Sequence, residues 1–390
     1  MAPPIASSTM TTSRTAEMAR VDSFRMRAGQ IFCACDSDGL PIDIGRLPQS
    51  ASLERMALAF GTSVLAQVLT LAVLPLASAA ITPSPSVLPL PYLALLAGAA
   101  LASYPASILM DMFGRKSAFA LGASLGLAGG ILTAWALLDR QFSGFVIGAL
   151  WLGMAQGFAL FYRHAGAIAA RAGGFVFGAG AFGALLGPFI IEAVNAATGP
   201  MAAAYVLGLV GLINCLTLGL AIGLPSRQIE IESDAASVQR PAWPLFLTST
   251  GIAALAWFAM TGIMARAPLI MAGCGIGASM TASAMAVHLA AMYVPGFVIG
   301  RWVAISGGVK VGLAGLGLVA LGGGVLLFQT SSIGFSLAMV VAGFGWGTAT
   351  IGAMAMLHRD ARPSPLWLAL HDASLFVAAL LGALTLGRLG

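Results

Sequence analysis

The sequence contains little charge. Charged side chains make up 8% of its 390 residues, whereas soluble domains average about 25%. Hydrophobic residues make up 59% of the chain, and its mean hydropathy is +0.93. This composition excludes a soluble globular protein, so the net charge of +5 is not read as a sign of nucleic-acid binding. We expect an all-α protein that crosses a lipid bilayer many times.

Motifs of ATP-driven and enzymatic chemistry are absent as well. The chain has no G-x-x-x-x-G-K-[ST] nucleotide loop and no C-P-C membrane motif, so an ATP-driven pump is not expected. Nothing in it resembles a hydrolase triad, and we expect neither an enzyme nor a bound cofactor. The four cysteines suggest no disulfide framework. No apolar run follows the early arginines, as a secretory signal peptide would require.

Long apolar runs dominate the rest of the chain. A bilayer core of ~30 Å needs about 20 apolar residues per helix. Six runs of this kind precede a polar stretch and five follow it, and the predicted spans are 56–81, 88–110, 117–138, 143–162, 172–194, 200–224, 244–265, 279–303, 308–329, 332–357 and 365–388. The predicted parts are a flexible cytoplasmic segment at 1–54, a six-helix bundle at 55–224, a cytoplasmic loop at 225–243 and a second bundle at 244–390.

The basic residues predict the orientation. With the N-terminus in the cytoplasm, sixteen of the 19 Lys and Arg residues fall inside and only Arg140, Arg266 and Arg388 fall outside. Loops rich in Lys and Arg stay in the cytoplasm of bacteria, so this orientation is favoured. The inside residues are Arg14, Arg20, Arg25, Arg27, Arg46, Arg55, Arg115, Lys116, Arg163, Arg171, Arg227, Arg240, Arg301, Lys310, Arg359 and Arg362.

A short motif follows the second predicted span. Asp111-Met-Phe-Gly114-Arg115-Lys116 resembles D-x-x-G-R-[RK], the signature of the major facilitator superfamily between its helices 2 and 3. Gly permits a tight turn there, and the Asp can pair with Arg or cap a helix, so the motif predicts conformational gating. The family usually has Gly four residues before the Asp, where this chain has Ser107.

The resemblance implies the major facilitator fold. That fold has two pseudo-symmetric helical bundles, a central cavity near the bilayer midplane and alternating access by rocking. Twelve helices are expected in this family, whereas we count eleven, so a twelfth is missing or one span is wrongly divided.

Two pairs of soft metal ligands lie in the second bundle. Met260 and Met264 form M-x-x-x-M, and His288 and Met292 form H-x-x-x-M. At this spacing both side chains of a pair project from one helix face. Thioether sulfur favours Cu(I), and imidazole also binds copper. Consecutive antiparallel helices can bring the two pairs together, which predicts a copper site at mid-membrane depth.

The same segments are similar to helices 7 and 8 of CcoA-type bacterial copper importers. The resemblance implies that copper is the transported substrate, carried across the inner membrane for cytochrome oxidase assembly and passed to a cytosolic copper chaperone. It also implies a monomer whose partner is the lipid bilayer. The segment Tyr162-Arg163-His164 resembles the Y-R-F of this group, with His164 in place of Phe and no Asp after it.

Weaker candidates complete the predicted sites. Accessory metal ligands are Cys274, Met354, Met356, Cys33 and Cys35, for each of which core packing or no role is an alternative. Coupling candidates are Arg163, His164, Glu192, His371 and Asp372. We expect His371, Asp372 and Glu192 near the membrane interface because they lie close to span ends, and we expect His358 in a loop that contacts water.

Two other functions compete with copper import. Riboflavin carriers resemble copper importers closely, and a facilitator for an organic solute would depend on aromatic and polar side chains instead of Met264 and His288. A facilitator-like assembly factor that transports nothing is the third reading, and uptake into proteoliposomes separates it from a carrier.

Overall fold

The structure is a computed structural model, and it describes residues 49–165, 170–224, 241–359 and 363–386. Cys33 and Cys35, like the rest of the first 48 residues, lie outside this range. The first half forms α2 (Gln49–Ile81), α3 (Leu90–Leu138), α4 (Phe142–Ala165), α5 (Ala170–Gly178), α6 (Gly180–Thr198) and α7 (Ala202–Ile222), with short 3-10 helices η1 (Pro85–Val87) and η2 (Gly199–Met201).

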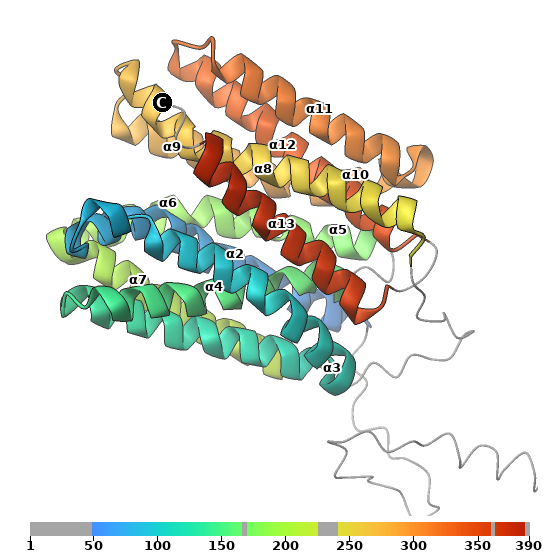
Figure 1. Cartoon of the computed structure of the whole chain (residues 1–390), viewed down its shortest axis with the longest axis horizontal. Coiled ribbons are helices and arrows are strands. Elements are labelled where there is room, and N and C mark those ends of the chain that lie inside the picture. The colour runs from blue at the N-terminus through green and yellow to red at the C-terminus, as the bar shows by residue number, and fades with distance from the viewer. Residues whose placement is uncertain (1–48, 166–169, 225–240, 360–362, 387–390) are drawn as a thin grey trace, which may run out of the picture. The chain divides into compact units, whose positions relative to one another are not determined.

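The second half continues with α8 to α13. These are α8 (Trp243–Gly273), α9 (Ala278–Tyr293), α10 (Pro295–Ser306), α11 (Gly308–Leu326), α12 (Ser332–Leu357) and α13 (Pro365–Thr385). Figure 1 shows α2 to α7 in blue to green beside α8 to α13 in yellow to red, as two bundles of long helices. The predicted all-α membrane architecture is therefore confirmed for the described residues.

The apolar helices agree with the predicted crossings. The described residues contain nine apolar helical stretches long enough to span a bilayer, and two of them, Pro85–Leu138 and Ala172–Ile222, are 54 and 51 residues long. A crossing needs about 20 residues, so each of these two holds a pair of crossings. The chain turns within them at Gly114 and at Gly199, where φ is 81° and 55°. Nine stretches thus accommodate the eleven predicted spans.

Two single crossings are broken near their middle. α5 gives way to α6 at Ala179, and α9 gives way to α10 where Val294 precedes Pro295. Proline has no N–H to continue the helical hydrogen bonds, which explains the second break. The broken crossings pack against each other between the bundles, α5 on α10 and α6 on α9. A second contact between the bundles joins α3 and α13.

Close approach of backbones holds the first bundle together. A Cβ on Gly153 of α4 would lie 1.9 Å from the Leu95 carbonyl oxygen of α3. A Cβ on Gly98 of α3 would lie 2.2 Å from the Leu150 oxygen of α4. Within lipid, helix association depends on packing rather than on the hydrophobic effect, so small residues at such contacts contribute directly to stability.

Gly153→Ala is expected to destabilise the first bundle. The added methyl group meets backbone atoms that cannot rotate away, and overpacking of this kind costs about 1–3 kcal/mol. Thermal unfolding of the purified protein in detergent should therefore begin at a lower temperature. Gly219→Ala is the matched control, because a Cβ on this exposed glycine of α7 meets nothing within 4 Å. Equal melting temperatures for the two variants would contradict the packing described.

Candidate functional site

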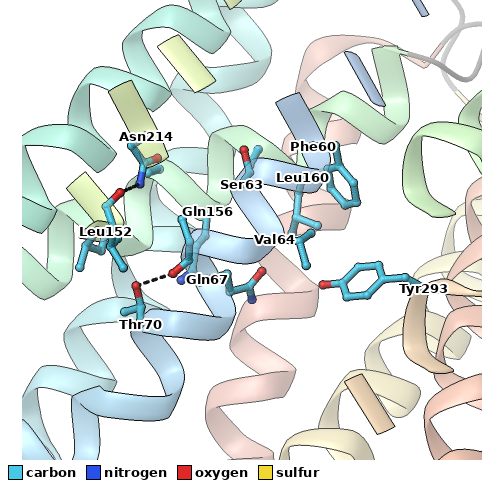
Figure 2. A pocket seen from close by; sticks show the side chains of 14 residues that line it. Phe60, Ser63, Val64, Gln67, Thr70, Leu152, Gln156, Leu160, Asn214 and Tyr293 are labelled. Atoms are coloured by element: carbon cyan, nitrogen blue, oxygen red, sulfur yellow. Dashed lines mark hydrogen bonds between the residues drawn. The ribbon is translucent and has the colours of Figure 1, made fainter. Parts of the chain in front are cut away.

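A pocket lies between α2, α4, α7 and α9, and the empty space within it, open solvent included, is about 440 Å³. Its lining residues on α2, α4 and α7 lie near the middle of these helices, and Tyr293 ends α9 at the break in its crossing. Figure 2 shows the side chains of Gln67 and Gln156 at its centre and the Tyr293 hydroxyl approaching from the second bundle. The residues that line it are Phe60, Ser63, Val64, Ala66, Gln67, Thr70, Leu152, Ala155, Gln156, Ala159, Leu160, Val210, Asn214 and Tyr293.

The polar groups of the cavity are held in place by their own helices. The Thr70 hydroxyl donates to the Ala66 carbonyl at 2.8 Å, and the Asn214 amide donates to the Val210 carbonyl at 2.9 Å, as the dashed lines in Figure 2 show. Hydroxyl and amide side chains in apolar helices commonly bond back to the preceding turn. The carbonyl oxygen of the Asn214 side chain lies against Gly126 of α3.

Two aromatic rings, Phe60 of α2 and Tyr293 of α9, line the cavity, and further rings pack against them. The Tyr293 ring lies 6.1 Å from Phe60, 5.1 Å from Phe177 and 6.1 Å from Trp346, measured between centroids. Trp257 of α8 extends the group, 5.2 Å from Trp346. The Trp257 Nε1 is buried with no hydrogen-bond partner among the described residues. A buried donor without an acceptor is costly, and Trp257 is not among the residues that line the cavity.

A buried ion pair joins the two bundles. Arg163, near the end of α4, places Nη2 2.6 Å from Asp372 Oδ1 of α13, and the two side chains are 1% and 0% exposed. The Asp372 Oδ2 and the Arg163 Nε and Nη1 have no partner among the described residues. Intramembrane charges are retained where they pair or function. This pair closes the end of the bundles at which α3 turns at Gly114, which we call the Gly114 end.

Three of the four histidines surround this pair. His164 Nε2 lies 3.2 Å from Asp372 Oδ1, and His164 Nδ1 lies 3.0 Å from Nε2 of His358, which caps α12. The His371 ring is 6.3 Å from that of His164, and its Nδ1 lies 2.9 Å from the Thr250 hydroxyl of α8. The structure thus brings four elements, α4, α8, α12 and α13, to one cluster.

The structure shows how two of the predicted regions are packed. His371 and Asp372 are buried, 2% and 0% exposed, and their place near the membrane interface stays a prediction. His358 lies just after α12 and is half-buried against His164, and its contact with water also stays a prediction. The start of α13 is covered because it packs against α3 and α8, and proximity to a span end does not reveal this. Glu192, by contrast, is exposed on α6, near the end of its span as expected.

His288 lies in a close contact between α9 and α12. It is fully buried, and its Nδ1 donates to the Met339 carbonyl at 2.7 Å. Nε2 therefore carries a lone pair, and it has no partner among the described residues. Metal-binding histidines often donate their other ring nitrogen to a backbone carbonyl in this way. Interhelical hydrogen bonding is the alternative role.

The remaining predicted ligands lie on two helices. Met260 and Met292 are buried, and Met264 is half-buried. α9 packs chiefly against α12 and α6, with little contact to α8, so His288 faces α12 rather than the Met260 helix. A joint site of the two pairs stays a prediction.

The predicted accessory metal ligands differ in how far they are buried. Cys274 is exposed just after α8. Met354 and Met356 are buried in α12, where the Met356 side chain packs against the backbones of Gly308 and Gly312. This contact is ordinary core packing, which is the alternative to metal binding given above for these methionines.

The predicted gating motif lies at the Gly114 end. Gly114 has φ 81° and ψ 174°, a conformation that glycine adopts without strain, so the predicted turn is present. Asp111, Ser107 and Pro365 line a second, smaller pocket between the bundles. The Ser107 hydroxyl donates to the Pro365 carbonyl at 2.6 Å. The residue that departs from the family pattern thus forms a hydrogen bond from one bundle to the other.

Comparison with known proteins supports a transporter. No family model matches the chain. The chain is 28% identical over 295 residues to the riboflavin transporter RfnT of Brucella anthropi, a match that covers 70% of this chain and 72% of that protein. This similarity is to a carrier of an organic solute.

Solved structures define the class of the fold. The proton:xylose symporter XylE bound to 6-bromo-6-deoxy-D-glucose superposes with a TM-score of 0.66 and 16% identity over 86% of each chain. The human organic anion transporter MFSD10 superposes with a TM-score of 0.64 and 15% identity, over 86% of this chain and 92% of that one. The chain has the major facilitator fold, as its motif predicted.

Removal of Asp372 alone is expected to destabilise the protein strongly. Asp372→Leu leaves the Arg163 guanidinium buried without a counter-charge, which costs about 3–5 kcal/mol. Arg163→Met combined with Asp372→Leu removes both charges and should recover most of the loss, because apolar replacement of a buried pair is often nearly neutral. Thermal unfolding in detergent measures both. A double variant with the summed loss of the two single variants would contradict the pairing.

Proposed function

We propose that this protein imports an organic solute with a planar, hydrogen-bonding ring system, of which riboflavin is the type, across the bacterial inner membrane by alternating access. The observation that carries the proposal is the central cavity, where amide and hydroxyl side chains line the same space as the Phe60 and Tyr293 rings. The similarity to a riboflavin transporter supports it independently.

The chemistry of the cavity fits such a ring. The edge of a flavin presents carbonyl oxygens and ring nitrogens, which the amides of Gln67, Gln156 and Asn214 can match as donors and acceptors. Its faces are apolar and planar, and they can stack on rings such as Phe60 and Tyr293. Pockets for small molecules combine apolar walls with a few placed polar groups in this manner.

Copper import is the second candidate. The observation that favours it is the His288 Nε2, a buried lone pair whose ring is fixed by the Met339 carbonyl. Met260, Met264 and Met292 would complete a soft ligand set for Cu(I) if α8 and α9 approach during transport. If neither riboflavin nor copper is transported, we expect the protein to be a facilitator-like assembly factor.

Gln67→Leu and Gln156→Leu are each expected to impair riboflavin uptake. Loss of one hydrogen bond to the solute costs about 0.5–1.5 kcal/mol, which corresponds to a KM roughly 2- to 12-fold higher. Initial rates of labelled riboflavin uptake into proteoliposomes measure this. Gln141→Leu makes the same change at an exposed position just before α4 and should leave KM unchanged. Wild-type liposomes that take up no more riboflavin than empty ones would contradict the proposal.

His288→Asn separates the two candidates. The Asn amide can still donate to the Met339 carbonyl, whereas the Nε2 lone pair is lost. We expect riboflavin uptake to be retained in this variant. Copper uptake in cells at matched protein levels, lost in both His288→Asn and Met264→Ala while riboflavin uptake stays at background, would instead establish the copper site.

A further inference from the structure

We infer that the central cavity selects its solute by charge, so that it carries neutral riboflavin and rejects the same flavin once a phosphate is attached to its tail. The inference rests on the proposed function, because it names which members of the proposed solute class the cavity accepts. It adds a criterion that the shape of the flavin ring does not supply, since riboflavin and its 5′-phosphate share that ring.

The residues that line the cavity are all uncharged. Figure 2 draws the side chains of 14 lining residues, most of which are apolar. The polar ones carry amide or hydroxyl groups, and they are Ser63, Gln67, Thr70, Gln156, Asn214 and Tyr293. Such groups donate and accept hydrogen bonds, which suits the carbonyl oxygens, ring nitrogens and tail hydroxyls of riboflavin. They supply no counter-charge, so nothing in this lining neutralises an anion.

The nearest arginine on α4 already has a carboxylate as its partner. Arg163 follows the lining residue Leu160 by three positions, so it lies about one helical turn closer to the Gly114 end. Its Nη2 is 2.6 Å from Asp372 Oδ1, and the two charges cancel. A phosphate that used the remaining N–H groups of Arg163 would share one cation with Asp372, and the two anions would repel each other. The pair therefore gives an anionic solute little stabilisation.

Closure over the solute turns this lack of counter-charge into selectivity. In alternating access the solute passes through a state in which both bundles enclose it and water no longer hydrates it. A buried ion without a counter-charge is strongly disfavoured, whereas a buried neutral group needs only hydrogen-bond partners. A phosphate monoester carries a charge of about −1.5 to −2 at pH 7, so the phosphorylated flavin is rejected at this step.

Steric exclusion is the alternative explanation for a difference between riboflavin and its 5′-phosphate, because the phosphate adds bulk as well as charge. A matched pair of compounds separates the two effects. The dimethyl ester of riboflavin 5′-phosphate is neutral and larger than the phosphate itself, and it keeps the ring and the tail. A cavity that selects by charge accepts the larger neutral ester and rejects the smaller anion, whereas a cavity that selects by size rejects the ester at least as strongly.

Competition for riboflavin uptake in proteoliposomes measures the selectivity. Initial rates of labelled riboflavin uptake are recorded at neutral pH against rising concentrations of each unlabelled flavin. We expect the dimethyl ester to reach half-inhibition within about tenfold of the concentration that riboflavin needs, and the 5′-phosphate to need a concentration about 100-fold higher than the ester. Labelled riboflavin 5′-phosphate should enter these liposomes no faster than it enters empty ones.

A cation placed in the cavity should relax the selection. Gln156→Lys brings an ammonium group to the lining, where it can pair with the phosphate. We expect the 5′-phosphate to inhibit this variant at a concentration about tenfold lower than in the parent, with little change for the neutral ester. Gln141→Lys makes the same change at an exposed position just before α4 and should keep the parent's selectivity. If Gln156→Lys does not stay monodisperse in detergent, Gln67→Lys takes its place.

Several results would overturn the inference while riboflavin uptake itself is intact. Equal inhibition by the 5′-phosphate and its dimethyl ester would show that charge is not sensed, and failure of both to inhibit would show exclusion by size. Unchanged selectivity in a folded lysine variant would show that a missing counter-charge is not the cause. Wild-type liposomes that take up no riboflavin would reject the proposed function, and the inference would fall with it.

Discussion

The rest of the structure depends on one buried ion pair between the bundles. Arg163 and Asp372 lie on helices 209 residues apart in sequence, and they meet where water is excluded. A pair of this kind is costly to bury and costly to break from one side only. If the protein works by alternating access, as proposed, the pair is intact in one end state and broken in the other. In this structure the pair is intact.

Packing by small residues makes the movement between these states feasible. The crossings that contact each other between the bundles are broken helices, α5–α6 and α9–α10, and their contact includes Gly174 against Gly296 with a would-be Cβ 2.6 Å from the opposite carbonyl. Smooth backbones can slide where interlocked side chains could not. The aromatic group of Phe60, Phe177 and Tyr293 lies beside this contact, so a ring bound there would be sensed by both bundles.

Much of the fold follows from the sequence, and much of the site does not. Hydropathy predicts the spans because each helix must be apolar over its own length, and Gly114 predicts its turn because only glycine adopts that φ readily. The cluster depends on which helices become neighbours. His164, His358 and Asp372 are far apart in the chain, and burial at the start of α13 comes from α3 and α8. Histidine is costly inside a membrane unless it is paired. The four histidines of this apolar chain were therefore a signal that some of them lie together.

The central cavity is harder to predict from the sequence. Gln67, Gln156 and Asn214 are the single amides of the apolar spans 56–81, 143–162 and 200–224, which is the signal that the sequence offers for it. The sulfur and imidazole pairs predict copper, whereas the structure directs His288 toward α12, and a joint site of the two pairs stays a prediction. The polar residues of the first bundle, together with the Phe60 and Tyr293 rings, form the better-defined site.

Titration of riboflavin fluorescence with the purified protein tests the central claim most directly. A flavin stacked on the aromatic wall should be quenched saturably, and Gln67→Leu should weaken the binding while Gln141→Leu should not. Fluorescence that stays constant up to saturating protein, with Cu(I) binding that depends on His288, would contradict the organic-solute assignment.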